Sequence, residues 1–500
     1  MKSADRVIVV GCGNAALCAA ISARESGADV VVIERAPRAL RGGNSAFTAG
    51  AMRVAYESAD ELADLMPDLT DAELATTDFG VYPESQFFDD IARVTEYRAD
   101  PELADVLVRE SMPTLLWMRD HGVKFLPIYG RQAFKIDGKF TFWGGLTVEA
   151  WGGGVGLVDA LAQEAERIGV EIRYETEAIG LERRDNGIAG VHVRSKGVRD
   201  FLPGRAVVLA AGGFQANPEW RTRYLGPGWD LAKVRGTRFN TGGGIQIGLD
   251  AGASPAGNWS GCHAVGWERN APEFGDLSVG DGYQKHSYPF GIMVNANGER
   301  FVDEGADFRN YTYAKYGRRI LEQPHQFAWQ VFDSKVTHLL RDEYRIREVT
   351  KVKANTLEEL AEKLEGVDAE AFLATVAEYN ASVDTDVPFN PNVKDGRRTQ
   401  ALAVPKSNWA NTIDAGPFEA YQITCGITFT FGGLRVNADG EALDQAGDHV
   451  DGLFACGEMA GGLFYFNYPG GSGLTYGSVV GRRAGRKAAA RVGASMPVAT

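Results

Sequence analysis

The chain has 500 residues, 44% of them hydrophobic and 24% charged, which is enough apolar material for the cores of two or more domains. Its formal net charge of -14 does not suit a nucleic-acid-binding protein. No apolar run approaches the roughly 20 residues of a membrane helix. The five cysteines are scattered and form no CxxC pair, so no metal or iron–sulfur site is expected in the chain itself.

The expected compartment is the cytoplasm. The first apolar run begins near residue 6, which leaves no room for a signal peptide. Cysteines without a paired spacing are typical of small buried residues in a reduced protein.

A nucleotide-binding motif opens the chain. Two short apolar runs, Val7–Val10 and Val30–Ile33, predict buried parallel strands, and the helical pattern of Ala15–Ser26 joins them. The sequence GCGNAA stands between the first strand and the helix, and Glu34 ends the second strand. Strand, glycine turn, helix, strand and terminal acid are the parts of a dinucleotide-binding βαβ unit.

Each residue of the motif has a physical task. Gly11 allows the tight turn, Gly13 lets the backbone approach a pyrophosphate, and Ala16 lets the helix pack against the strand. The helix N-terminus offers unpaired N–H groups and the positive end of its dipole to the phosphates. Glu34 stands where a carboxylate accepts hydrogen bonds from a ribose. A bound nucleotide is therefore expected here.

After this unit, loops and regular elements alternate. A loop of small residues, 41–51, surrounds Asn44 and Ser45, whose side chains can donate to the heteroatoms of a flat ring; an ordinary loop is the alternative. The stretch 57–121 is mostly helical by period, with breaks at prolines. The later expected elements are helices over 151–168, 356–364, 368–383 and 474–491, strands over 170–174, 206–211 and 452–458, and a sheet meander over 188–202.

A change in residue composition divides the chain. From about Trp259 polar and aromatic residues are interleaved, and near the end the sequence returns to glycine-rich strand and helix patterns. We therefore expect residues 259–405 to form a domain inserted into a nucleotide-binding domain made of residues 1–258 and 406–500. The last helix is expected to have Ser472 as its N-cap.

Three glycine-rich segments far apart in the chain need one explanation: residues 11–16, residues 212–214 with 242–244, and residues 457–473. A nicotinamide cofactor needs one such segment, whereas FAD is longer and its isoalloxazine ring must be held by other parts of the chain. A helix that starts near Ser472 can direct its N-terminus at the flavin N1–C2=O edge, which stabilises reduced flavin. The sequence therefore predicts FAD.

The whole chain resembles the flavoprotein family of fumarate reductases and succinate dehydrogenases. The matching segments are GCGNAA, RGGNS, AAGGF, TGGG, GERFVDE and GLFACGE. The resemblance implies an α/β fold, in which a Rossmann-like FAD-binding domain carries an inserted α+β capping domain and the active site lies between the two. The residues expected to bind FAD are Gly11, Gly13, Asn14, Ala15, Ala16, Glu34, Arg35, Arg41, Gly42, Gly43, Asn44, Ser45, Thr48, Ala49, Gly50, Ala211, Gly212, Gly213, Gly457, Glu458, Ser472, Gly473 and Leu474.

Two departures from the family pattern bear on the cofactor and the substrate. Covalent members carry a histidine before the Gly-Gly pair, but this loop reads Arg38-Ala39-Leu40-Arg41, so FAD is expected to be non-covalent. The family's carboxylate-binding histidine falls near Phe429 or Thr430, and the arginine of its last glycine loop falls at Tyr468. These replacements weaken a fumarate assignment and agree with members of the family that oxidise a tricarboxylate.

Oxidation of a CH–CH bond beside carboxylates needs cations for the carboxylates, a hydride acceptor and a base for the acidic proton. The resemblance implies that His263 binds substrate and that Arg309 is an active-site group. Because the pKa of an arginine stays above about 12, Arg309 is expected to clamp a carboxylate, while Tyr311 or Tyr468 takes the proton. Further candidates for binding substrate carboxylates are Lys285, His286, Lys406 and Thr430.

The expected function is that of an FAD-dependent dehydrogenase acting on a small tricarboxylate or dicarboxylate. Alternatives with the same cofactor are a fumarate- or urocanate-type reductase and a 3-ketosteroid dehydrogenase. The tyrosines and the YPGG sequence favour the last of these. A non-catalytic electron-transfer subunit is the alternative of another class. The resemblance also implies a membrane-associated iron–sulfur protein as electron acceptor, which would hold the enzyme at the inner face of the membrane.

Overall fold

The computed structural model describes residues 5–185 and 187–494. Its central element is a six-stranded sheet in the order β20-β21-β13-β1-β2-β9, parallel except where β20 pairs with β21. Three of its strands are continuous apolar runs, as expected for a parallel sheet that is covered on both faces. The strands are β1 (Val7–Val10), β2 (Val30–Ile33), β9 (Glu171–Arg173), β13 (Ala206–Leu209), β20 (Glu441–Leu443) and β21 (His449–Ala455).

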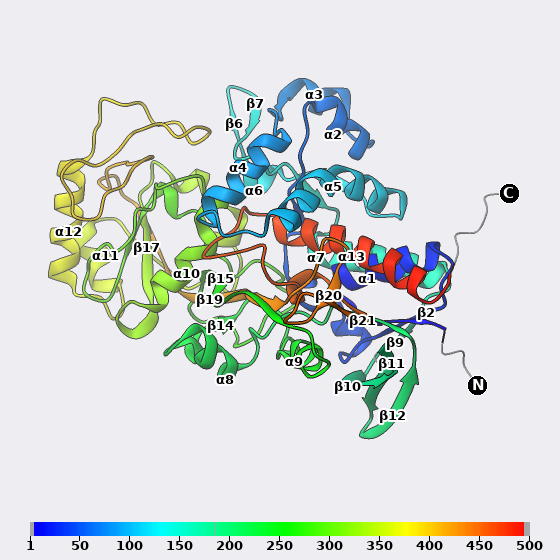
Figure 1. Cartoon of the computed structure of the whole chain (residues 1–500). Helices are drawn as coiled ribbons and strands as arrows, with labels where there is room; N and C mark the ends of the chain where they lie inside the picture. The colour runs from blue at the N-terminus through cyan, green and yellow to red at the C-terminus, as the bar shows by residue number, and fades with distance from the viewer. Residues whose placement is uncertain (1–4, 186, 495–500) are drawn as a thin grey trace.

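Three helices from distant parts of the chain pack together beside this sheet (Figure 1). They are α1 (Asn14–Glu25), α7 (Gly153–Arg167) and α13 (Ser472–Arg491). Helix α9 (Gly243–Asp250) also contacts the sheet, through β13. The predicted α/β fold is confirmed, and the opening βαβ unit has the expected strand bounds with a helix that begins one residue earlier than predicted.

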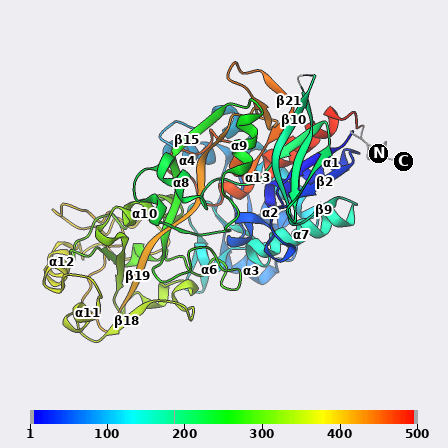
Figure 2. The ribbon, with the colours of Figure 1, turned by 90° about the horizontal axis from the view of Figure 1, so that it is seen from below.

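A second sheet, in the order β14-β19-β17-β16, builds the other half of the molecule, and β15 and β18 also pair with β19. Figure 2 shows β19 running from this half toward the first sheet. Helix α10 packs on β15 and β19, and α11 packs on α12. The elements are β14 (Lys233–Val234), β15 (Pro255–Glu268), β16 (Ile292–Val294), β17 (Ala328–Phe332), β18 (Lys351–Ala354), β19 (Phe418–Leu434), α10 (Tyr313–Leu321), α11 (Leu357–Lys363) and α12 (Ala369–Ser382).

The position of β19 bears on the expected domain limits. This strand is 17 residues long and lies after residue 405, where the sequence analysis placed the second part of the FAD-binding domain. In the structure it pairs with β14, β15, β17 and β18 of the second sheet. The apolar pattern of a strand does not show which sheet of the fold the strand joins. The division at residues 258 and 405 stays a prediction.

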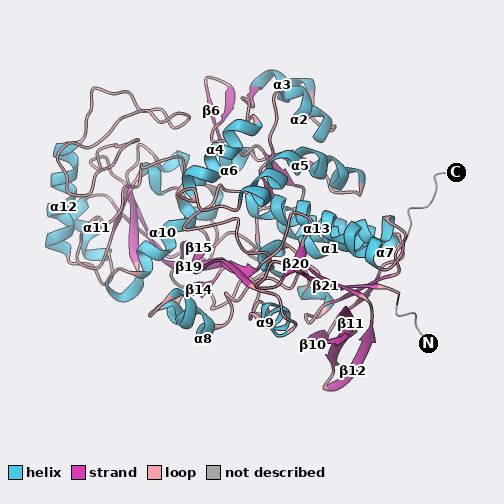
Figure 3. Ribbon diagram, in the orientation of Figure 1, coloured by secondary structure: helices cyan, strands magenta, loops and turns pink. Residues whose placement is uncertain are grey.

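The remaining elements lie around these two sheets (Figure 3). Helices α2 to α5 form a group at one edge. The meander expected over 188–202 is formed by β11 and β12, and β10, which was not predicted, adds a third strand. Among the described residues, no helix is both long and apolar enough to cross a membrane. The elements are α2 (Ala59–Leu65), α3 (Asp71–Thr76), α4 (Glu84–Val94), α5 (Pro101–Asp120), α6 (Tyr129–Gln132), α8 (Pro218–Trp220), β3 (Ala51–Met52), β4 (Thr77–Asp78), β5 (Phe125–Pro127), β6 (Ala133–Ile136), β7 (Lys139–Phe142), β8 (Val148–Ala150), β10 (Thr176–Arg184), β11 (Gly187–Ser195) and β12 (Val198–Pro203).

Candidate active site

A long cavity follows the carboxyl ends of β1, β2, β13 and β21, where ligands bind in open α/β sheets. It continues between the two halves of the molecule to Arg235, Arg309 and Tyr313. The predicted FAD-binding residues that line it are Gly11, Gly13, Asn14, Ala15, Glu34, Arg35, Gly42, Gly43, Asn44, Ser45, Thr48, Ala49, Ala211, Gly212, Gly457, Glu458, Gly473 and Leu474.

The other predicted FAD-binding residues lie just behind the lining. They are Ala16, Arg41, Gly50, Gly213 and Ser472. Arg41 pairs with Asp159 at 2.6 Å. Gly50 allows a close approach of two loops, because a Cβ there would lie 2.8 Å from the carbonyl carbon of Gly153. These residues shape the cavity without facing it.

Two glycines of the first turn allow close approaches of backbone segments around the cavity. Gly11 has φ +114°, and a Cβ there would lie 2.4 Å from the Ala210 carbonyl oxygen. A Cβ on Gly13 would lie 3.2 Å from the Gly42 carbonyl oxygen. The turn therefore requires glycine on steric grounds, and it leaves the N-terminus of α1 open toward the cavity.

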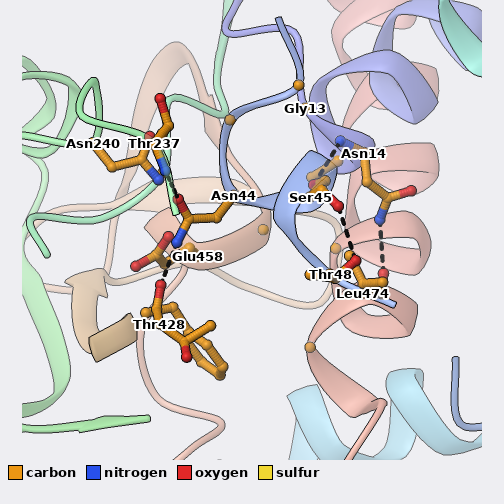
Figure 4. Close-up of a pocket in the computed structure, with 18 of the residues that line it drawn as sticks. Gly13, Asn14, Asn44, Ser45, Thr48, Thr237, Asn240, Thr428, Glu458 and Leu474 are labelled. Atoms are coloured by element: carbon orange, nitrogen blue, oxygen red, sulfur yellow. Dashed lines mark hydrogen bonds between the residues drawn. The ribbon is translucent and has the colours of Figure 1, made fainter. Parts of the chain in front are cut away.

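Asn14 ties three segments of the cavity wall together (Figure 4). Its backbone N–H donates to Ser45 Oγ at 3.1 Å. Its side-chain amide donates to the Leu474 carbonyl and to Ser478 Oγ, both at 2.9 Å. The N-terminus of α1, the loop after β2 and the first turn of α13 are thus held in one arrangement.

The side chains of Asn44 and Ser45 are already bonded to the protein. Asn44 donates to the Thr428 carbonyl and accepts from the Thr237 N–H at 3.0 Å (Figure 4). Ser45 Oγ accepts from Asn14. These hydrogen bonds position the loop that lines the cavity, and they leave the Ser45 hydroxyl hydrogen and one N–H of the Asn44 amide free to donate. That these two side chains donate to a ring stays a prediction.

The N-terminus of α13 differs from the expected cap. Gly471 occupies the cap position with φ 85°, and Ser472 is the first residue of the helix. The Ser472 hydroxyl is fully buried and has no hydrogen-bond partner among the described residues. Gly471 and Gly473, at the start of this 20-residue helix, line the cavity, so the N–H groups of the helix N-terminus fit the oxygen and nitrogen acceptors of a flavin edge.

Two buried carboxylates line the cavity. Glu34 is 7% exposed and accepts from the Ala36 N–H at 2.7 Å; burial raises its pKa. Glu458 accepts from the Thr430 N–H at 2.8 Å, and burial raises its pKa to about 7. Thr430 therefore supports Glu458, whereas the sequence analysis expected it to bind substrate.

Arg309 is a buried cation, and Glu343 acts on it only from beyond contact distance. Its Nη2 donates to the Arg131 carbonyl at 2.8 Å, its Nη1 lies 3.1 Å from His286 Nδ1, and its Nε has no partner. Within the described part of the chain, no carboxylate lies within 4.0 Å of its guanidinium. Burial lowers its pKa, and a charge in this state calls for an anionic ligand.

The tyrosines near Arg309 separate into two groups. The hydroxyls of Tyr313 and Tyr468 are hydrogen-bonded to each other, and both residues line the cavity. The Tyr311 hydroxyl donates to Asp90 at 2.5 Å and does not line the cavity. Sequence reasoning missed Tyr313; it begins α10, whereas Tyr311 ends the preceding turn.

The two predicted histidines lie directly behind this surface. The His263 ring is stacked 5.2 Å from Phe429 and lies 4.9 Å from both Tyr313 and Tyr468. Neither of its ring nitrogens has a hydrogen-bond partner among the residues described. Burial lowers the pKa of His263 and of His286 well below the usual value. Burial therefore favours the neutral form of both rings, which can still donate one N–H to a ligand.

The two predicted lysines do not reach the cavity. Lys285 Nζ donates to the carbonyls of Gly282, Tyr283 and Gln284 at 3.2–3.3 Å. Lys406 Nζ donates to the Gly291 carbonyl. Burial lowers the pKa of each lysine to about 8. Their ammonium groups bind backbone carbonyls, and neither side chain lines the cavity in which a substrate carboxylate would lie.

The cations that do line the cavity beside Arg309 were not predicted. They are Arg131, on the short helix α6, and Arg235, which directly follows β14. Both pair with Asp281, at 2.9 and 2.7 Å. No motif marks these arginines, because they come from separate loops that only the folded chain brings together.

Comparison with known proteins agrees with this geometry. Residues 6–474 match the family described as FAD binding domain, and the chain belongs to that family. FAD is therefore its cofactor, and the predicted cofactor is confirmed. The glycine turn and the two helix N-termini at the cavity fit this group on the structure's own evidence.

The chain is similar to oxidoreductases of different substrates. It is 27% identical over 492 residues to a probable fumarate reductase, Ifc3, of Shewanella frigidimarina, covering 97% of this chain and 74% of that protein. It is 25% identical to 3-oxosteroid 1-dehydrogenase of Mycolicibacterium smegmatis, covering 94% and 95%. The open conformation of a flavocytochrome c3 fumarate reductase superposes with a TM-score of 0.71 at 25% identity, covering 97% and 78%. The chain is thus an FAD-dependent oxidoreductase.

Gly13→Val should abolish FAD binding, because a branched side chain would press on the Gly42 carbonyl and the Ser45 hydroxyl and displace the turn that approaches the pyrophosphate. FAD retention on gel filtration, read at 450 nm, measures the effect. Gly180→Val is the matched control, since a Cβ at Gly180 meets no atom within 4 Å. Normal FAD content in the Gly13 variant would show that the turn does not hold the pyrophosphate.

Wild-type protein should release its FAD on acid precipitation. The loop before Gly42 carries Arg38, Ala39, Leu40 and Arg41 and offers no histidine for a covalent link. The measurement is the flavin absorbance of the supernatant and of the washed pellet. Flavin that stays with the denatured protein would contradict non-covalent binding.

Proposed function

We propose that this protein oxidises the CH–CH bond of a small polycarboxylate, with tricarballylate as substrate and an aconitate as product. Support for the oxidoreductase class comes from the family and the cavity. Support for the tricarboxylate comes from the sequence resemblance, in which Tyr468 and the residues Phe429 and Thr430 replace groups that a fumarate reductase uses.

The observation that carries this proposal is Arg309, which no carboxylate of the described residues contacts directly, beside the Tyr313–Tyr468 hydroxyl pair inside the FAD cavity. A buried guanidinium without a carboxylate is stabilised by a carboxylate ligand, which its fork can bind with two parallel hydrogen bonds. A carboxylate on Arg309 would bring the adjacent carbon and its acidic hydrogen toward the tyrosine hydroxyls.

The proposed roles follow from these positions. FAD, when bound, supplies the acceptor for a hydride from one carbon of the substrate. Tyr468, hydrogen-bonded to Tyr313, accepts the proton from the neighbouring carbon, and the carbon–carbon double bond forms as both leave. His263 packs behind both tyrosines and Phe429 and holds their rings in position.

A second candidate substrate is a 3-oxosteroid. The hydroxyl pair could hydrogen-bond a ketone, and the aromatic residues Phe429, Phe431 and Phe464 also line the cavity. The similarity to 3-oxosteroid 1-dehydrogenase covers 95% of that relative. Three arginines at the substrate end of the same cavity, Arg131, Arg235 and Arg309, favour the polycarboxylate.

We also propose that an iron–sulfur protein at the membrane reoxidises the flavin, which would keep the enzyme at the cytoplasmic face. Support for this partner comes only from the sequence resemblance. Anaerobic titration of the substrate-reduced enzyme with a candidate acceptor, followed by the return of flavin absorbance, tests it.

Arg309→Lys should slow flavin reduction by tricarballylate about 10- to 100-fold, because lysine keeps the charge but loses the fork geometry. FAD affinity should not change. Anaerobic stopped-flow bleaching at saturating substrate measures the rate, with Arg319→Lys as the matched control at an exposed arginine paired with Glu322. Wild-type bleaching by a 3-ketosteroid and not by tricarballylate would reject the substrate assignment.

The rate of flavin reduction should rise with pH. Burial raises the pKa of Tyr468 above its ordinary value of 10.0, so at neutral pH the phenol holds its proton and the base form is scarce. Below that pKa the base fraction grows about tenfold per pH unit. Stopped-flow rates between pH 6 and 9 check this, and Tyr468→Phe should be slow and lack the slope. A flat wild-type profile would exclude Tyr468 as the base.

A further inference from the structure

One carboxylate holds two arginines in the wall of the FAD cavity. Asp281 Oδ1 accepts from Arg235 Nε at 2.7 Å, and its Oδ2 accepts from Arg131 Nη1 at 2.9 Å and from Gln284 Nε2 at 2.7 Å. All four residues line the cavity. Asp281 is 7% exposed, so this cluster is largely shielded from water.

The cluster joins separate parts of the fold at the substrate end of the cavity. Arg131 belongs to α6, Arg235 follows β14, and Asp281 lies on the loop between β15 and β16. The Arg131 carbonyl also accepts from Arg309 Nη2 at 2.8 Å. Three guanidinium groups are thus gathered around one space.

The three guanidiniums share one direct carboxylate partner. Among the described residues, Asp281 is the one carboxylate within 4.0 Å of any of them. Glu343, Glu149 and Asp342 act on Arg131 only at longer range. Largely buried guanidiniums with so few direct partners are stabilised by a ligand that brings carboxylates of its own.

We infer that Arg131 and Arg235 form a second carboxylate subsite facing Arg309, and that Asp281 is the positioning residue that holds both guanidiniums toward the cavity. The ligand class is an organic anion with at least two carboxylates. This inference rests on the proposed function, since it assigns the far carboxylate of the same substrate.

The direct test compares a tricarboxylate with a monocarboxylate on oxidised holoenzyme, without turnover. Calorimetric titrations with tricarballylate and with butyrate give both dissociation constants. Wild type should bind tricarballylate at least about tenfold more tightly than butyrate, because only tricarballylate reaches the second subsite. Arg131→Gln should remove most of that preference and leave butyrate binding unchanged.

Asp281→Asn separates positioning from a general field effect. The substitution makes the cavity more positive, so a pure field effect would tighten binding of every anion. Loss of positioning instead weakens tricarballylate binding severalfold and leaves butyrate binding unchanged. Asp439→Asn is the matched control, because Asp439 holds Arg483 at 2.7 Å and Lys487 at 2.9 Å outside the cavity.

FAD content and melting temperature show whether each variant is folded. Arg131 is the safer position, since its side chain is 24% exposed, against 8% for Arg235. Arg235→Lys is the second variant; it keeps the charge, loses the fork and should lose part of the preference. If the folded variants keep the wild-type preference for tricarballylate, or lose affinity for both ligands equally, the subsite is rejected.

The two proposals fail in different ways. If tricarballylate binds with the expected dependence on Arg131 and does not bleach the flavin, the subsite stands and the proposed reaction fails. If tricarballylate bleaches the flavin and Arg131→Gln binds it like wild type, the reaction stands and the subsite fails.

Discussion

The structure depends on the direct backbone contact between its first and last helices. A Cβ on Gly481 would lie 2.4 Å from the Ala15 carbonyl oxygen, and one on Gly485 would lie 2.1 Å from that of Ala19. Only glycine permits this approach of α13 to α1. Asn14 can then reach the Leu474 carbonyl across 460 positions of sequence. The contact places two helix N-termini at one cavity, which neither helix could form alone.

The two ends of the cavity differ in whether backbone or side-chain groups form them. Backbone forms the FAD end, where glycine turns and helix termini offer N–H groups whose positions follow from secondary structure. Side chains form the substrate end, where Arg309, Tyr313 and Tyr468 come from the second half of the chain. A backbone site of this kind suits a cofactor common to many enzymes, whereas side chains can change with the substrate.

This difference explains what the sequence could predict. The βαβ unit, the glycine turns and the role of Glu34 follow from local pattern, and the structure has the two strands at their expected limits. The substrate end depends on the direction in which each side chain points and on loops that are distant in the sequence. Nothing in the pattern distinguishes Tyr311, which turns to Asp90, from Tyr313 two residues later. The ammonium groups of the predicted Lys285 and Lys406 donate to backbone carbonyls. Arg131 and Arg235, which line the cavity, belong to no recognisable sequence motif.

The long pairing of β15 with β19 has a mechanical consequence. The ladder runs from Pro255 opposite Leu434 to Glu268 opposite Ile423, and Leu434 also bridges to Ala460 near the first sheet. Any swing of the second half against the first must bend this ribbon. The ladder is interrupted next to His263, where bending is easiest, and His263 packs against Tyr313 and Tyr468. Bending of the ribbon at this point would therefore disturb the hydroxyl pair.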